Sequence, residues 1–284
     1  MHSSQKHFLL PIKELFTNKK IIENHFLNYA GAQIFRVLLS SAAYSCRRML
    51  QSWPSTDLTT MLRKNGFIII PKFLRRNDFQ KVKYEFFNKA KSGFYSPIKD
   101  GDTKVERYTF SFDKWQMLPA VKKLLSDKLL LTTLGGVELE NVRIGDIWFD
   151  TIYYDDSQNM DSSQNQLHSD TFYNTHKVWF FIEPVSLEDG PLCFVPGSNH
   201  LTIRHLIFEY LKSIRFDKLT PHERRVLTKN EKFLDYKEET LACLDNTLII
   251  ANTRGFHRRG NAKAGHSRKQ IHFCIRTKNP FSFY

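Results

Sequence analysis

Two histidines and one aspartate in this 284-residue sequence have the types and spacing of a metal site. His168 precedes Asp170 by two positions, and residues two apart on a strand point to the same face of the sheet. His257 follows an apolar strand-like segment, residues 248–251, and can supply a third ligand from a distant strand. Two imidazoles and one carboxylate leave three open positions on a six-coordinate Fe(II), as in non-haem iron oxygenases. Zinc hydrolases use similar ligands, but their HExxH helix is absent here.

An arginine that follows the third ligand in the sequence could bind the carboxylate of a keto-acid co-substrate. A 2-keto acid would fill two of the open positions and leave the last for dioxygen, so its far carboxylate needs a fixed cation. Arginine provides a bidentate hydrogen-bonding fork for a carboxylate. Arg268 lies eleven residues after His257, at the start of the next predicted strand, and is the residue type required.

The elements that must position these residues are predicted as helices followed by short strands. Helical periodicity or caps predict helices at 57–65, 77–92 and 118–134, and residues 93–112 are predicted as a loop. Apolar and β-branched runs predict strands at 67–71, 142–154, 192–195, 241–244, 247–251 and 270–277, with two more strands within 166–184. This order predicts an α+β fold with an antiparallel barrel or sandwich and a helical insertion at about 201–240.

Four sets of residues, taken together, resemble the phytanoyl-CoA dioxygenase family of Fe(II)- and 2-oxoglutarate-dependent oxygenases. They are His168-Ser169-Asp170, Glu188-Asp189-Gly190-Pro191-Leu192, Val195-Pro196-Gly197-Ser198-Asn199-His200, and His257 with Arg268. Asn65-Gly66-Phe67 resembles the opening strand of that family, so the resemblance spans residues 57–280. It implies a double-stranded β-helix, a cupin-like jelly roll, with N-terminal helices and the helical insertion.

The resemblance implies a role for each matched residue. His168, Asp170 and His257 are expected to bind Fe(II), and Arg268 is expected to hold the 5-carboxylate of 2-oxoglutarate. Halide-using relatives replace the acid with a small residue. The presence of Asp170 therefore favours hydroxylation, with dioxygen as the oxidant.

Three further residues are candidates for the same site. Tyr153 or Tyr154, before the loop that leads to His168, is a candidate contact to 2-oxoglutarate. Both tyrosines are equally expected as core aromatics of the barrel. Gln166 shares the predicted strand face of His168 and can orient a ligand or substrate, with an ordinary polar strand residue as the alternative.

The sequence is strongly basic, with 42 Lys and Arg against 29 Asp and Glu and a formal net charge of +13. Residues 251–284 hold eight bases and no acid, so part of the excess surrounds His257. Such an excess indicates an acidic substrate, an anionic membrane surface or nucleic acid. Lys104, Arg107 and Arg258 are candidates to meet an acidic substrate, with a solvated basic rim as the alternative. The 41% apolar residues exclude a disordered chain.

Residues 1–53 are predicted as a helical segment that precedes the oxygenase domain, residues 54–284. Residues 27–46 are long enough to span a bilayer, but Arg36 and several polar residues interrupt them. Lys19-Lys20 and Arg47-Arg48 flank this stretch, which predicts an amphipathic helix that either lies on a membrane surface or packs on the catalytic domain. The start lacks the layout of a signal peptide and the four cysteines form no CxxC pair. We therefore expect a cytoplasmic protein that is peripheral on the inner membrane.

These features give one leading hypothesis and two alternatives. The leading hypothesis is hydroxylation of an acidic, membrane-presented substrate, which resembles the activity of the Kdo (3-deoxy-manno-octulosonic acid) hydroxylases of lipopolysaccharide. Oxidation of an acyl-CoA or another small acid is the alternative within the same enzyme class. A basic nucleic-acid-binding protein on a non-catalytic barrel would explain the charge but not the His-Asp-His set, so it is the least expected.

Overall fold

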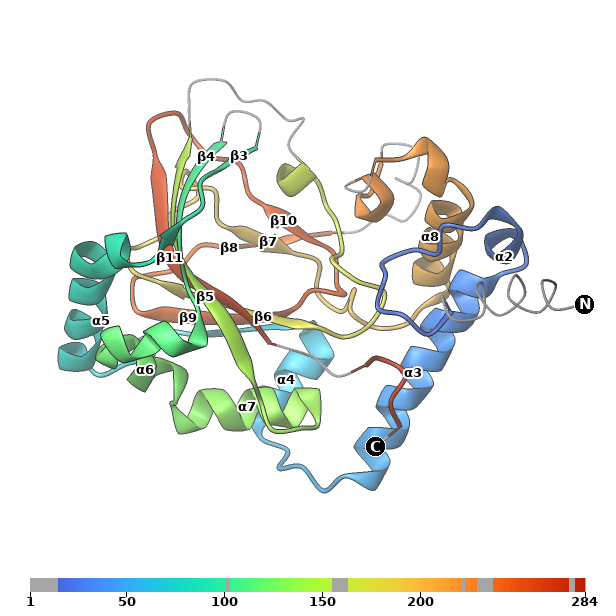
Figure 1. Ribbon diagram of the computed structural model, residues 1–284, viewed down its shortest axis with the longest axis horizontal. Coiled ribbons are helices and arrows are strands. Elements are labelled where there is room, and N and C mark those ends of the chain that lie inside the picture. The colour runs from blue at the N-terminus through green and yellow to red at the C-terminus, as the bar shows by residue number, and fades with distance from the viewer. Residues whose placement is uncertain are drawn as a thin grey trace, which may run out of the picture.

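The computed structural model describes residues 15–100, 103–154, 163–220, 223–228, 237–275 and 279–283. Two antiparallel sheets lie at its centre, and helices group on two sides of them (Figure 1). Apolar side chains fill the space between the sheets and beneath the helices. This arrangement confirms the predicted α+β class.

The larger sheet has eight strands in the order β1-β9-β6-β11-β5-β4-β2, and β3 also pairs with β4. Its strands are β1 (Phe67–Ile70), β2 (Phe94–Tyr95), β3 (Ile98–Asp100), β4 (Thr103–Phe110), β5 (Ile144–Tyr154), β6 (His176–Phe181), β9 (Thr247–Asn252) and β11 (Ser267–Ile275). Side chains alternate between its faces: Val178 and Phe180 pack under the helices, while Trp179 and Phe181 point to the smaller sheet. Inward residues of β5, β6 and β11 can therefore line one common space.

The smaller sheet has three strands in the order β10-β7-β8. Its strands are β7 (Leu192–Phe194), β8 (Glu239–Leu241) and β10 (His257–Arg259). An apolar cluster that includes Phe67, Phe181 and Phe194 packs this sheet against the larger one. An antiparallel bridge between His168 and His257 adds one more segment at the β10 edge. Both predicted histidine ligands thus lie at this edge.

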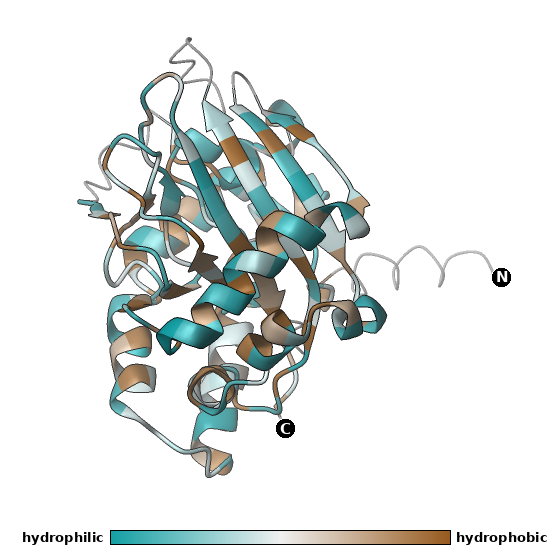
Figure 2. Ribbon diagram, turned by 90° about the vertical axis from the view of Figure 1, so that its left-hand side faces the viewer, coloured by the Kyte–Doolittle hydropathy of each residue, from teal (hydrophilic) through white to brown (hydrophobic). Residues whose placement is uncertain are grey.

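Four helices cover the outer face of the larger sheet: α4 (Asp57–Asn65), α5 (Arg76–Lys89), α6 (Pro119–Leu125) and α7 (Lys128–Glu138). The buried side of α5 carries Phe79, Val82 and Phe86, and Figure 2 shows hydrophobic and hydrophilic residues alternating along the helix. A capping box formed by Thr56 and Thr59 begins α4. Because these helices bury the outer face, the inner face is left for a site.

A second helical group, α2 (His25–Tyr29), α3 (Ala32–Leu50) and α8 (Ile203–Ile214), lies on the opposite side of the molecule from α5 (Figure 1). The short 3-10 helices are η1 (Ala90–Ser92), η2 (Phe112–Met117), η3 (Ser163–Asn165), η4 (Phe216–Lys218) and η5 (Glu223–Arg225). The Tyr44 hydroxyl of α3 donates to the Val137 carbonyl of α7 at 2.8 Å. Asn28 of α2 donates to the Ser213 carbonyl of α8 at 2.8 Å. The N-terminal segment therefore packs on the rest of the chain.

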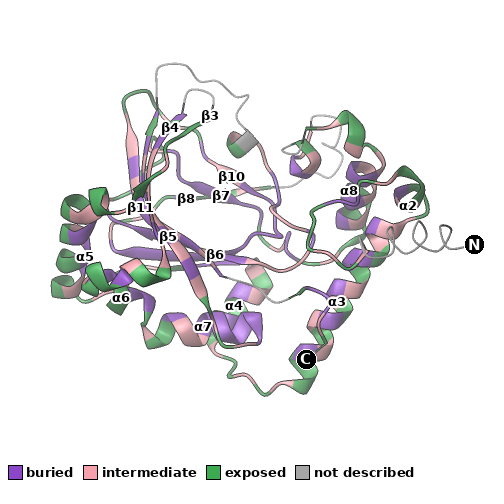
Figure 3. Cartoon of the chain, in the orientation of Figure 1, coloured by how far each residue is buried: buried purple, intermediate pink, exposed green. Residues whose placement is uncertain are grey.

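The longest helix, α3, has an unusual polarity. Its buried side includes the polar residues Gln33 and Arg36, whereas Phe35, Leu38 and Met49 are 51%, 46% and 78% exposed. Figure 3 shows buried and exposed residues alternating along this helix. Among the described residues, no helix is both long and apolar enough to cross a membrane.

Four segments differ from the sequence predictions. The helix predicted at 118–134 is two helices, α6 and α7, because the Asp127 side chain caps a new helix there. Residues 93–112 form β2, β3 and β4 instead of a loop, because β4 pairs with β5 from Thr103 to Phe110 and this pairing outweighs the polar composition. Residues 166–184 hold one strand, β6, and the bridge at His168 instead of two strands. Within the described part of the insertion, the only α-helix is α8. This part returns to the barrel through a 2.7 Å bond from Leu227 N to the Leu167 carbonyl.

Candidate metal centre

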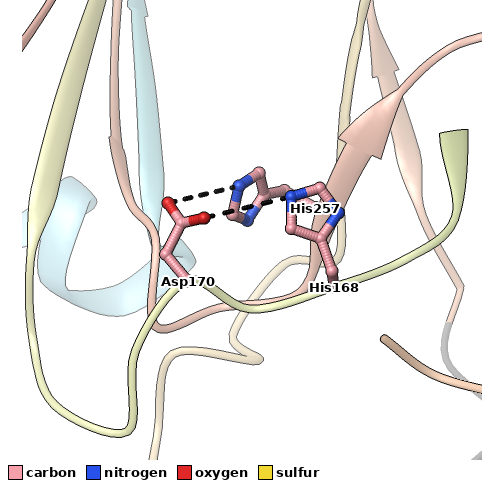
Figure 4. Close-up of side chains that lie close together, drawn as sticks. All are labelled: His168, Asp170 and His257. Carbon is pink, nitrogen blue, oxygen red and sulfur yellow. Dashed lines mark ion pairs between the residues drawn. The ribbon is translucent and has the colours of Figure 1, made fainter. Parts of the chain in front are cut away.

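Main-chain hydrogen bonds bring the three predicted ligands together. His168 and His257 exchange two bonds, in which the N–H of each residue donates to the carbonyl of the other at 2.9 Å. The Asp170 N–H donates to the Thr253 carbonyl at 2.8 Å. This pairing turns the side chains of His168 and Asp170 toward His257 (Figure 4).

The three side chains converge closely enough to share one ion. One possible ligand atom from each residue lies within 4.8 Å of the other two. His168 Nε2 is 4.0 Å from Asp170 Oδ1, and His257 Nε2 is 3.8 Å from Asp170 Oδ2. The two imidazole centroids are 4.5 Å apart. Two nitrogens and one carboxylate form the donor set of the facial triad that binds non-haem Fe(II), so the residues present fit this ion.

Hydrogen bonds on the far side of each ring fix the tautomer that a metal requires. His168 Nδ1 lies 2.8 Å from the Gln166 carbonyl, and His257 Nδ1 lies 2.9 Å from the Gly255 carbonyl. Since a carbonyl only accepts, each Nδ1 carries the proton and each Nε2 presents a lone pair to the site. Burial lowers the pKa of both imidazoles, and the charge of His257 helps to lower the pKa of His168 to about 3. Both rings are therefore neutral near pH 7, as metal binding requires.

Lys177 belongs to this site, although the sequence interpretation missed it. Its Nζ lies 2.8 Å from Asp170 Oδ2. Burial alone would raise the pKa of Asp170, but the charges of Lys177 and the two histidines outweigh burial and hold that pKa well below its ordinary range. The sequence signal for Lys177 was the alternation of β6, in which residues 177, 179 and 181 line the cavity while residues 178 and 180 are core.

A cavity of about 410 Å³ adjoins the cluster and is lined by both histidines. Its volume lies in the range of small-molecule sites. Among the described residues, the lining has one aspartate, Asp150, and six bases: Lys99, Arg107, Lys177, Arg258, Arg259 and Arg268. The cavity is therefore strongly cationic.

Arg268 lies in this cavity and is only 7% exposed. Its Nη1 donates to the carbonyl of Gly190, and its Nε has no hydrogen-bond partner among the described residues. The Tyr154 hydroxyl lies 3.5 Å from the same carbonyl. Gly190 has φ +62°, and a Cβ there would collide with the Tyr154 ring. The Gly-Pro turn thus holds Tyr154 and Arg268 next to each other.

Four predicted contacts are not among the residues that line the cavity: Tyr153, Lys104, Gln166 and also Tyr154, although Tyr154 adjoins Arg268. Tyr153 is 37% exposed, and its hydroxyl lies 3.4 Å from Glu106. Lys104 pairs with the same Glu106 at 3.0 Å. The alternation of β4 and β5 turns both side chains outward, so the predictions for Tyr153 and Lys104 are corrected. Gln166 contributes its main-chain carbonyl to His168, and its side chain does not appear in the described lining.

Arg107 and Arg258 do line the cavity, but each is already paired with an acid. Arg107 forms a bidentate pair with Asp150, with bonds of 2.7 and 2.8 Å. Arg258 forms bonds of 2.8 and 2.5 Å to Glu238. The cation most available to a ligand in this part of the site is therefore Arg268.

Comparisons with known proteins place this geometry in context. The sequence model of the phytanoyl-CoA dioxygenase (PhyH) family matches residues 62–213. The fold is similar to the epimerase SnoN in complex with Fe3+, alpha ketoglutarate and nogalamycin RO, with a TM-score of 0.57, 14% identity and coverage of 78% of this chain and 82% of that chain. It is also similar to EctD from S. alaskensis with bound Fe, with a TM-score of 0.54, 10% identity and coverage of 82% and 85%. These likenesses confirm the predicted double-stranded β-helix. No curated protein matches the sequence significantly.

Replacing Arg107 by Leu is expected to lower the free energy of unfolding by about 3–5 kcal/mol at pH 7, because it leaves the buried Asp150 carboxylate without its bidentate partner. Burial raises the pKa of Asp150, but His272 and Arg107 outweigh burial and hold that pKa below its ordinary range. The pair therefore stabilises the fold above the ordinary carboxyl pKa of about 4, and this contribution is lost as the pH falls further. Urea unfolding should show that the difference in free energy of unfolding between the wild type and Arg107→Leu narrows as the pH falls from 4 to 3.

Lys104→Leu is the matched control, because this lysine lies on the same strand in an exposed ion pair. Its substitution should change stability little at either pH. If the wild type exceeds Arg107→Leu in free energy of unfolding by the same amount at pH 7 and pH 3, the proposed contribution of the Asp150 charge is contradicted.

Proposed function

The chain belongs to the phytanoyl-CoA dioxygenase family, and we propose that His168, Asp170 and His257 form the iron centre of a 2-oxoglutarate-dependent hydroxylase. The family match spans more than half of the chain, and members of the family are Fe(II)- and 2-oxoglutarate-dependent oxygenases. The observation that carries the assignment is the convergence of the three side chains within 4.8 Å. Bound Fe(II) would supply the oxidative chemistry that couples conversion of 2-oxoglutarate and dioxygen to hydroxylation of the substrate.

The residues around the cluster suit 2-oxoglutarate. Arg268 would hold the 5-carboxylate, because its buried guanidinium lies in the cavity and its Nε lacks a partner among the described residues. Tyr154 adjoins Arg268 at the Gly190 carbonyl and is the second contact that we assign to this co-substrate. Lys177 keeps the Asp170 carboxylate ionised and oriented. The protein thus holds the co-substrate at one end while the cluster faces the other.

The charge of the cavity supports an acidic substrate. Three of the six bases in the lining pair with carboxylates: Arg107 with Asp150, Lys177 with Asp170 and Arg258 with Glu238. The lining also holds Lys99, Arg259 and Arg268, and bound 2-oxoglutarate would offset only part of their charge. Lys99 on β3 and Arg259 on β10 lie in the lining and are the contacts that we propose for the substrate. Arg258 also lines the cavity, but its pair with Glu238 makes it the weaker candidate. An acidic sugar such as the Kdo of lipopolysaccharide is the leading candidate. An acyl-CoA carries comparable negative charge and is the alternative.

The outward face of α3 supports peripheral binding to an anionic membrane. Phe35, Leu38 and Met49 are exposed there, and large apolar side chains on the outside of a surface helix are typical of an interfacial contact. Residues 24–56 contain no Asp or Glu, so α3 itself contributes no carboxylate that would repel anionic headgroups. We propose the cytoplasmic face of the inner membrane as the surface on which a glycolipid substrate is presented.

Anaerobic addition of Fe(II) and 2-oxoglutarate is expected to give a weak visible charge-transfer band. His168→Ala removes a ligand and should abolish the band. Arg268→Met removes the cation for the 5-carboxylate, so the affinity for 2-oxoglutarate should fall by about 30-fold or more, or about 2 kcal/mol, while Fe(II) binding persists. Absorption titrations measure both affinities. A wild-type protein without the band would rule out the proposed centre.

Succinate release should rise when an acidic substrate is added. The assay compares acidic glycolipids, acyl-CoAs and amino acids at a fixed 2-oxoglutarate concentration. Lys99→Ala should raise the KM for the acidic substrate by about two- to fivefold, the effect of one exposed charge, while the KM for 2-oxoglutarate changes little. Lys91→Ala, an exposed lysine outside the described lining, is the control. Stimulation by neutral compounds alone would contradict an acidic substrate.

Sedimentation with lipid vesicles tests the membrane contact. The protein should co-sediment with vesicles that contain phosphatidylglycerol and much less with pure phosphatidylcholine. The double variant Phe35→Gln/Leu38→Gln should lose this binding, whereas Phe94→Gln, at a residue 67% exposed on β2, should retain it. Equal binding by the double variant would contradict the proposal. So would a wild-type dimer that the double variant dissociates, because α3 would then contact a second copy.

A further inference from the structure

We propose that Arg225 is a positioning residue for Asp170, and that Glu209 and Gln33 hold Arg225 in place. This inference rests on the proposed iron centre. Arg225 ends η5, in the segment after α8, and lies outside the two sheets that surround the cavity. Its side chain is only 2% exposed, so its charge must be compensated within the protein.

The Arg225 guanidinium bonds the main chain on both sides of Asp170. Its Nη2 donates to the Ser169 hydroxyl and to the Thr171 carbonyl, the latter at 2.9 Å. Its Nε donates to the Ser169 carbonyl at 3.2 Å. In return, the Ser169 N–H donates to the Arg225 carbonyl at 3.1 Å. Because one planar group fixes the main chain on both sides of Asp170, the Cα–Cβ bond of Asp170 keeps its direction, and the main chain cannot turn the residue away from the histidines without breaking several of these bonds.

A buried acid holds the guanidinium in this orientation. Arg225 Nη1 donates to Glu209 Oε2 at 2.8 Å, and Glu209 is fully buried on α8. Gln33 of α3 donates to the same oxygen at 2.9 Å. His205 Nε2 lies 3.4 Å from the other oxygen, Oε1. Because these groups are buried from solvent, the loss of one member leaves another polar group unpaired.

These contacts give two peripheral parts of the chain a role in the site. Glu209 and Arg225 belong to the predicted insertion, and Gln33 belongs to the N-terminal helical segment. Neither part supplies one of the three proposed ligands. Through Arg225, both parts act on residues 169–171. In other proteins, residues that orient a metal ligand without binding the metal have this role, and their loss commonly weakens metal binding 10- to 100-fold.

Co(II) titration of the metal-free, full-length protein tests the inference. Arg225→Lys keeps a charge beside Glu209 but cannot bond Ser169 and Thr171 together, so the Kd for Co(II) should rise about 10- to 100-fold. Ser169→Ala removes one bond to the guanidinium and should raise the Kd by a smaller factor. The visible spectrum of bound Co(II) should change in both variants, because it reports the arrangement of the ligands.

Arg47→Lys is the matched control. Arg47 is a buried arginine of α3 whose Nη1 donates to the Ser282 carbonyl, apart from the loop at Asp170. Its substitution should leave the Co(II) affinity and spectrum unchanged, even where the thermal midpoint falls.

The outcomes separate this inference from the proposed function. Wild-type protein that binds no Co(II) would overturn the iron centre and the positioning role together. Wild-type binding with an unchanged Kd and spectrum in both variants would overturn the positioning role alone. If Arg225→Lys fails to fold, Ser169→Ala decides the question by its own Kd and spectrum.

Discussion

The site depends on one pair of main-chain hydrogen bonds, those exchanged by His168 and His257. They join two segments that are far apart in the sequence and place both imidazoles on the same side. The bond from the Asp170 N–H to the Thr253 carbonyl then brings the carboxylate to the same side. Because these bonds are made by the main chain, the register of the pairing sets the ligand geometry. A slip of one residue would turn the side chains to the opposite face and separate the cluster.

Buried charge is the second constraint on the molecule. Three deeply placed carboxylates each have a cation within 2.8 Å: Asp150, Asp170 and Glu209 pair in that order with Arg107, Lys177 and Arg225. In each case burial raises the carboxyl pKa and the pairing outweighs burial. Part of the excess of basic residues is therefore structural. Arg107, Lys177 and Arg225 neutralise internal carboxylates and therefore add little to the charge offered to a ligand.

Sequence reasoning could predict the residues that belong to a motif or to a regular hydrophobic pattern. The separation of His168 and Asp170 and the turn at Gly190 depend on local spacing, and local spacing survives folding. It was harder to predict which face of the sheet each side chain occupies. Lys104 and Arg107 fall on opposite faces of β4, and this difference was hidden because residues 93–112 were predicted as a loop. Tyr153 and Tyr154 are adjacent on β5 and therefore point to opposite faces of the sheet in the same way.

Contacts between distant segments were beyond sequence reasoning. Lys177 reaches Asp170 because β6 lies beside β9 and β11 in the larger sheet, an order that no local pattern in the sequence specifies. Arg225 reaches the same loop because the insertion folds back along residue 167. In both cases the residue type is ordinary for its own segment, and its role arises only from the neighbour that the fold provides.

The bridge between residues 168 and 257 also limits how this protein can be recombined with its relatives. The family match ends at residue 213, so one side of the bridge lies inside the matched region and the other lies outside it. A chimera joined at that boundary would take the loop of Asp170 from one parent and His257, Arg268 and Arg225 from the other. Such a hybrid would form the site only if the two parents pair residues 168 and 257 in the same register. Sequence similarity within residues 62–213 does not guarantee this.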